Sequence, residues 1–193
     1  MEALEVHEKV EHAAGGAHAG GHGAPNRGVG LLIAALAAAL ALAEAAGGGA
    51  QTEALDRNVE ASNLWAFYQA KTIRMTIVRT AAEAARLQPG AGAGEQLDAW
   101  ERTAARYESE PGTGEGREEL AARAGTAEAA RARALAAYHL YEYGSAAFQL
   151  AIVLASATVI TGVAALALAA GGLGVVGIGL CLLGWLAPAA LHL

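Results

Sequence analysis

The sequence is poor in cysteine, proline and aromatic residues. It holds one cysteine, Cys181, four prolines, and aromatic side chains at 5% of its 193 positions. A single cysteine excludes a disulfide within the chain and disfavours a thiolate metal site. Basic residues are also few, at 13 against 19 acidic ones, which gives a net charge of −6. Nucleic-acid binding needs a clustered basic surface, so we expect no nucleic-acid partner.

Runs of β-branched residues, which favour strands, are scarce as well. Hydrophobic residues make up 54% of the chain, and alanine supplies much of that share. Alanine has the highest intrinsic propensity for the α-helix. The composition therefore predicts an all-α fold.

Three long segments carry almost no formal charge and are predicted to be transmembrane helices. They are residues 28–46, 146–170 and 173–193. About 20 apolar residues, each rising 1.5 Å, cross the hydrocarbon core of a bilayer. Glu44 is the one formally charged residue within them, and only Gly171 and Gly172 separate the last two, which predicts a tight transmembrane hairpin. We therefore expect an integral membrane protein with the lipid bilayer as a partner.

Residues 47–145 hold most of the charged side chains and are predicted to lie outside the membrane. After a glycine joint at Gly47–Gly49, the pattern predicts helices at 51–88, 95–110 and 117–143, with breaks where proline and glycine occur together. Both ends must reach the same membrane face, which predicts an antiparallel, coiled-coil-like hairpin stalk. Such a hairpin has little core of its own, so we expect a homo-oligomer or a subunit of a larger membrane complex.

A cluster of apolar, aromatic and basic residues in this stalk is predicted to form a packing or partner interface. Its members are Leu64, Trp65, Phe67, Tyr68, Lys71, Arg74, Trp100 and Tyr107. The residues of the outgoing helix are expected to pack against Trp100 and Tyr107 of the returning arm. Lys71 and Arg74 would then pair with carboxylates such as Glu101 or Glu108, or stack on an aromatic ring. The other interpretation is that they bind an acidic ligand.

Small residues recur at spacings of three and four along the two C-terminal spans. The candidates for transmembrane packing are Ala151, Ala155, Gly162, Gly174, Gly177 and Gly184. Stripes of small residues allow helix backbones to approach closely within a membrane. An alanine- and glycine-rich chain also produces such stripes by chance, so the spacing leaves both interpretations open.

Residues 1–27 form a polar tail that holds the only cluster of possible metal ligands. Its histidines are His7, His12, His18 and His22. Imidazole and nearby carboxylates suit zinc, copper or nickel. The competing interpretation is a polar tail that binds no metal, and we predict no cofactor.

Three sequence blocks resemble the signature of a known family. They are QTEAL at 51–55, ASNLWAFYQAKTIR at 61–74 and FQLAIVLAS at 148–156. They look like the bacterial membrane family catalogued as domain of unknown function 4337. The resemblance implies a multi-pass protein of the bacterial inner membrane, and it implies no activity. This chain departs from the family pattern in having only Gly171-Gly172, without basic residues, between its last two spans.

The sequence contains no phosphate-binding loop, no Ser-His-Asp or Cys-His arrangement and no HExxH motif. We therefore expect a non-enzymatic structural or assembly protein that self-associates or docks onto a membrane complex. The alternative is a metal-responsive or transport-associated protein that uses the histidine-rich tail. Three spans place the N-terminus on the opposite side from the stalk, and the family likeness favours a cytoplasmic N-terminus and a periplasmic stalk.

Overall fold

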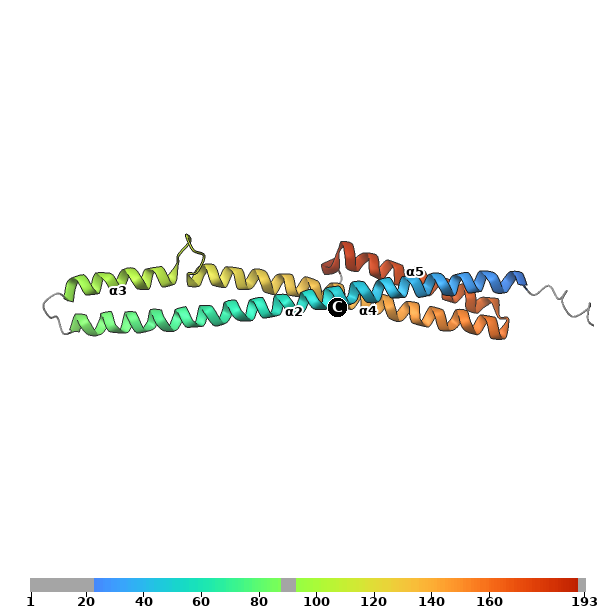
Figure 1. Cartoon of the computed structure of the whole chain (residues 1–193), viewed down its shortest axis with the longest axis horizontal. Helices are drawn as coiled ribbons and strands as arrows, with labels where there is room; N and C mark the ends of the chain where they lie inside the picture. Colours follow the sequence, from blue (N-terminus) through green and yellow to red (C-terminus); the bar gives the residue numbers. More distant parts are fainter. Residues whose placement is uncertain (1–22, 88–92, 191–193) are drawn as a thin grey trace, which may run out of the picture. The chain divides into compact units, whose positions relative to one another are not determined.

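A computed structural model describes residues 23–87 and 93–190 of the chain. Its elements are α2 (Gly23–Leu87), α3 (Ala93–Glu108), α4 (Arg117–Thr161), α5 (Ala164–Leu186) and the short 3-10 helix η2 (Pro188–Ala190), shown in Figure 1. The described residues contain no strand. The prediction of an all-α fold is confirmed.

Helix α2 is continuous over 65 residues. The expected joint at Gly47–Gly49 does not occur, so the predicted first span and the predicted outgoing arm belong to one helix. Glycine in a helix interior costs roughly 1 kcal/mol relative to alanine. Gly47 permits a close contact instead: a Cβ atom there would lie 3.3 Å from the Cβ of Tyr141. Gly47 therefore serves packing, and none of the three glycines interrupts the helix.

The turn between the last two long helices lies at Gly162–Val163, and the prediction of a turn at Gly171-Gly172 is wrong. Gly162 adopts φ +72°, a left-handed conformation that favours glycine and commonly ends a helix. Its N–H donates to the Thr158 carbonyl oxygen at 2.9 Å, which closes the last turn of α4. Gly171 and Gly172 lie inside α5, so the boundaries predicted at 170 and 173 are corrected to 161 and 164.

Three helices are long and apolar enough to cross a membrane, by length and composition: α2, α4 and α5. With the corrected turn, the uncharged part of α4 runs from Tyr143 to Thr161. These 19 residues span about 28 Å at the helical rise, close to the hydrocarbon thickness of a bilayer. Helix α5 supplies another 23 residues without a formal charge.

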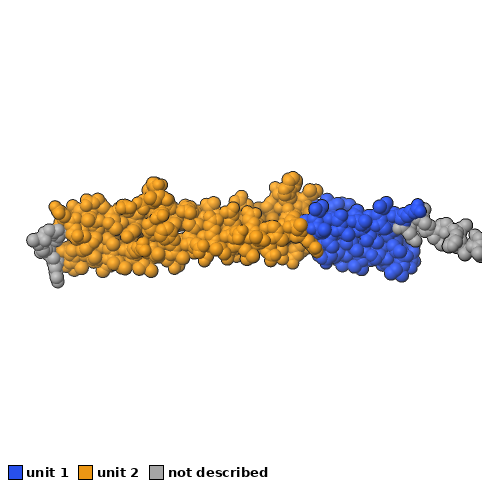
Figure 2. Space-filling view, in the orientation of Figure 1, with its two compact units in different colours: residues 1–42, 144–179 blue, residues 43–143, 180–193 orange. Residues whose placement is uncertain are grey.

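The chain divides into two compact units (Figure 2). Unit 1 comprises residues 1–42 and 144–179, described from residue 23 onward. Its interior combines small residues such as Ala151, Ala155 and Ala170 with Phe148 and Leu36. Many of its large aliphatic side chains are exposed, and Ile160 and Leu168 are 87% and 79% exposed. An exposed aliphatic surface around closely packed helices suits packing within lipid.

Unit 2 comprises residues 43–143 and 180–193. Within it, α2 contacts α3 and α4 in antiparallel order. Arg86 pairs with Glu101, Arg79 with Glu108, and Trp65 with Glu128. A small core forms where Leu64 of α2 meets Leu120 and Ala124 of α4.

Candidate functional site

Arg117, the first residue of α4, is the centre of a polar cluster in unit 2. Its side chain is only 17% exposed. Nε donates to Thr72 Oγ1 at 2.9 Å and Nη2 donates to the Tyr68 hydroxyl at 2.7 Å. Nη1 donates to both carboxylate oxygens of Glu108, at 3.0 and 3.2 Å. One guanidinium group therefore joins α2, the end of α3 and the start of α4.

Lys71 lies beside this centre and is buried, with 7% of the residue exposed. Its Nζ is 3.7 Å from Glu115 Oε2. It also lies 5.3 Å from the ring centroid of Phe67 and 5.4 Å from that of Tyr107. A desolvated ammonium group is stabilised by a carboxylate partner and by aromatic faces. The side chain therefore connects α2 both to α3 and to the loop before α4.

The connection between α3 and α4 is closed by the carboxylate of Glu119. Ser109 Oγ donates to it at 2.6 Å, and the backbone N–H of Glu110 donates at 3.2 Å. The Ser109 hydrogen bond, aided by the backbone donor and opposed by desolvation, lowers the pKa of Glu119 below its ordinary value of 4.5. A Cβ atom at Gly116 would clash with the backbone nitrogen of Glu110, so the tight connection requires glycine there.

The pKa of Glu110 is also lowered, chiefly by its hydrogen bond with Arg106. Arg106 Nε and Nη2 donate to Glu110 Oε1 at 3.0 and 2.7 Å. This pair joins the last turn of α3 to Glu110, which lies two residues beyond the end of the helix. The connection therefore carries two carboxylates that are held in their charged form.

The predicted aromatic interface forms with different partners from those expected. Trp65 and Tyr68 meet edge to face, with centroids 5.4 Å apart, and both pack against the small core with α4. Trp65 Nε1 donates to Glu128 Oε1 at 2.8 Å. Trp65 and Tyr68 thus face α4 and not Trp100 and Tyr107 as predicted, because α3 ends at Glu108 and α4 is the neighbour of α2 at this level. Phe67 and Tyr107 lie on the same ammonium group of Lys71.

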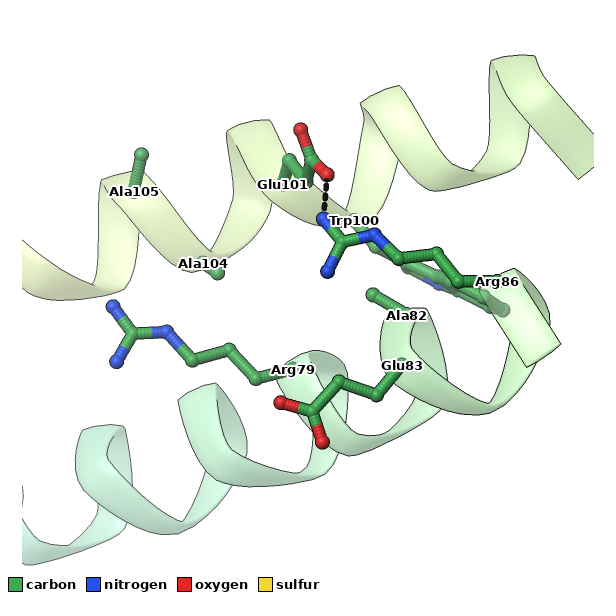
Figure 3. Close-up of a pocket in the computed structure, with 8 residues that line it drawn as sticks. All are labelled: Arg79, Ala82, Glu83, Arg86, Trp100, Glu101, Ala104 and Ala105. Atoms are coloured by element: carbon green, nitrogen blue, oxygen red, sulfur yellow. Dashed lines mark hydrogen bonds and ion pairs between the residues drawn. The ribbon is translucent and has the colours of Figure 1, made fainter.

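Trp100 of α3 lines a recess between α2 and α3 (Figure 3). The α2 side chains that line this recess include Arg79, Glu83 and Arg86. In the close-up, Arg86 reaches across to Glu101, which also lines the recess. The recess is therefore bounded by an ion pair that joins the two helices.

The ion-pair partners predicted for Lys71 and Arg74 are corrected. Glu101 pairs with Arg86, and Glu108 pairs with Arg79 and Arg117. Lys71 pairs with Glu115 instead, and the stacking on a ring that was also predicted occurs over Phe67 and Tyr107. Arg74 is exposed and has no ion pair within the part of the chain that the structure describes.

Sequence reasoning missed Arg117 and Glu115. A signal for Arg117 was present, because a basic residue at a helix N-terminus faces the positive end of the helix dipole. Such an unfavourable position calls for a compensating carboxylate. Neither local spacing nor periodicity indicated that Glu108, nine residues earlier, supplies it.

The small-residue positions divide between packing contacts and a turn. In unit 1, Ala151 and Ala155 are fully buried. A Cβ atom at Gly174 would lie 2.7 Å from Leu36, and one at Gly177 would lie 2.7 Å from the Phe148 ring. In unit 2, a Cβ at Gly184 would lie 3.3 Å from that of Leu140. Gly162 has open space around it and forms the turn, so its prediction as a packing residue is wrong.

The histidines of the tail, His7, His12, His18 and His22, lie outside the described residues. Among residues 23–87 and 93–190, no group of three or more His, Cys, Asp or Glu side chains is placed to hold a metal ion. Every buried side-chain nitrogen or oxygen in this part has a hydrogen-bond partner. The Arg117 cluster is therefore satisfied internally, and its evident chemical role is to tie helices together.

Residues 25–187 match the model of a family described as a domain of unknown function (DUF4337). Searches of curated proteins and of solved structures return no match for the chain.

Proposed function

This chain belongs to the DUF4337 family, whose description names no activity, and we propose that it is a non-enzymatic structural or assembly protein of a bacterial inner membrane. It crosses the bilayer three times and either self-associates or serves as an accessory subunit of a larger membrane complex. The observation that carries this proposal is the Arg117 cluster, in which the buried basic side chains of unit 2 hold helices together.

The outer surface of unit 1 supports the assignment to a membrane. Leu150, Val153 and Ile160 are among its exposed aliphatic residues. Such a surface is unfavourable in water and is the expected one for lipid contact. The three spans would comprise the first part of α2, the last part of α4, and α5.

The charged part of unit 2 is proposed to be an extramembrane hairpin stalk with coiled-coil-like packing. Antiparallel ion pairs such as Arg79–Glu108 connect its two arms. With three spans, the N-terminus and the Gly162 turn lie on one side of the membrane and the stalk on the other. We place the N-terminus in the cytoplasm and the stalk in the periplasm, following the family likeness.

The experiment that tests this function is the mass of the particle purified gently from native membranes in nanodiscs, with identification of whatever co-purifies. A single chain has a mass of 19.4 kDa. We expect either a defined multiple of this mass or a stoichiometric complex with other subunits. A strictly monomeric particle with no co-purifying protein would contradict the proposal.

A further inference from the structure

Among the described residues between 47 and 140, exposed large apolar side chains lie on one helix, α2. They are Leu55, Val59, Phe67, Ile73, Ile77 and Leu87. Helix α3 and this part of α4 contribute none of them. The surface of α2 that faces away from its partners therefore differs from the rest of the segment.

Five of these residues share one face of α2, and we call them the apolar stripe: Leu55, Val59, Ile73, Ile77 and Leu87. Their exposed fractions range from 57% to 83%. Small exposed residues such as Ser62 and Ala66 occupy the intermediate positions, so spacings of three and four continue along the face. The stripe covers 33 residues, or about 48 Å of helix. An apolar repeat at spacings of three and four that continues over this length indicates a seam between two helices.

The stripe lies opposite the face that α2 buries within its own unit. Leu64, Met75 and Ala82 are buried, and at 100° per residue they project about 180° away from Ile73 and Ile77. A surface helix normally places polar residues on the face opposite its buried one. Here both faces are apolar, so packing against α3 and α4 leaves the second face without a partner.

Charge is absent from the stripe. The nearest charged residues, Asp56, Arg74 and Glu83, lie about 90° from its centre line at 100° per residue. Two identical stripes can therefore meet face to face without opposing like charges, which would penalise a pair of identical helices. The apolar stripe can therefore pack against the same stripe of a second chain.

We propose that the apolar stripe pairs with the same stripe of a second copy, as a parallel, in-register seam between two α2 helices. This inference rests on the proposed membrane function, because chains inserted with one orientation present α2 in the same direction. Leu55 then faces Leu55, and Ile73 faces Ile73. The two hairpins lie back to back, each retaining its own contacts with α3 and α4.

Site-directed cross-linking in native membranes tests this seam. Cys181→Ala provides a cysteine-free background, and single cysteines replace Ser62 on the stripe or Ala129, an exposed small residue of α4. We expect oxidation to shift S62C from the 19.4 kDa band to the dimer band, with no such shift for A129C. Equal cross-linking at the two positions would overturn the seam.

Orientation is read from the same assay. In a parallel pair, cysteines at 55 and 77 each cross-link to themselves. An antiparallel pair centred on Ala66 would cross-link neither of these positions to itself and would instead join position 55 to position 77. That pattern would overturn the parallel arrangement.

A charge on the stripe should separate the copies. We expect I73E to abolish the S62C dimer band, while A129E, which adds the same charge to α4, leaves it unchanged. Circular dichroism should show equal helix content in both variants, since both positions are exposed. Persistence of the dimer band in I73E would overturn the seam.

The mass measurement separates the two proposals. An oligomer of defined mass without a cross-link at S62C would overturn the α2 seam and leave the assembly function standing. A monomer without partners would overturn both.

Discussion

Arg117 occupies a position that helix electrostatics disfavours, because the N-terminus of α4 carries partial positive charge. The side chain is retained there by Glu108, Tyr68 and Thr72, which together accept from all three guanidinium nitrogens. These contacts are specific for arginine, because the planar guanidinium group holds its N–H donors at fixed angles. A lysine ammonium group could not reach all three acceptors in this arrangement. The residue therefore holds the position of α4 against α2 and α3.

Replacing this side chain should loosen the connection between the helices. R117A removes charge-assisted hydrogen bonds and leaves Glu108 without one of its partners, so we expect a loss of about 2 kcal/mol in unfolding free energy. R117K should recover only part of it. R74A is the matched control, since Arg74 is exposed, and should change stability by less than about 0.5 kcal/mol. Denaturant titration in detergent micelles measures these differences, and equal losses for R117A and R74A would contradict the assignment.

The lowered pKa of Glu119 predicts a dependence of stability on pH. A carboxyl group whose pKa is lower in the folded than in the unfolded chain stabilises the fold above the unfolded value. That contribution is lost as the pH falls from about 4.5 through the lower folded pKa. Glu110 acts in the same direction.

We therefore expect the melting temperature to fall in this acid range. The fall should be smaller in E119Q, which cannot ionise, than in E118Q, a change at its exposed neighbour. Thermal melts over a series of acidic buffers provide the measurement. Identical profiles for the two variants would show that the Ser109–Glu119 contact does not contribute.

At the scale of the element, the end of α4 is determined by one glycine among several. Gly162 follows the residues Thr158 to Thr161, all of them β-branched, which form helix less readily than alanine or leucine. It adopts a left-handed conformation there. Gly171 and Gly172 are surrounded by alanine and leucine, and their segment continues as a helix. Two adjacent glycines therefore terminate a helix less effectively here than one glycine that follows a run of β-branched residues.

Alanine substitutions distinguish the two turn positions. G162A forces an alanine into the left-handed region and should destabilise the chain by about 1–2 kcal/mol. G171A places alanine in a helix interior with open space around it and should stabilise by up to about 1 kcal/mol. Unfolding in mixed micelles measures both. A destabilising G171A together with a neutral G162A would return the turn to the position predicted from the sequence.

At the level of the whole molecule, the two units differ in the residues that they expose. Both bury mainly alanine, together with Leu36 and Phe148 in unit 1 and Leu64 and Leu120 in unit 2. Unit 1 exposes leucine, isoleucine and valine, whereas unit 2 exposes most of its charged residues. The first surface suits lipid, where close packing rather than hydrophobic burial associates helices. The second suits water, where apolar burial stabilises the fold.

The fold class, the presence of three membrane-compatible segments and the family could all be predicted from the amino-acid sequence alone. Each depends on composition or on residues adjacent in the chain. Helix propensity, length and apolar content are local properties, and they need no knowledge of neighbours in space. The helix ends near Pro89 and Pro111 were predicted correctly to within a few residues for the same reason.

The pairing of side chains between helices could not be predicted in this way, because it depends on how the helices pack in space. Lys71 could have paired with any of several acids, and its choice of Glu115 depends on where α3 ends and how the connection to α4 turns. The Gly162 turn and the continuous α2 were likewise decided by packing, which outweighs the small helix-breaking cost of glycine. The apolar stripe is visible in the sequence as a periodic pattern. The structure shows that α3 and α4 pack on the opposite face of α2 and leave the stripe exposed. Both neighbours lie on the same side of α2, so they cannot cover its second apolar face.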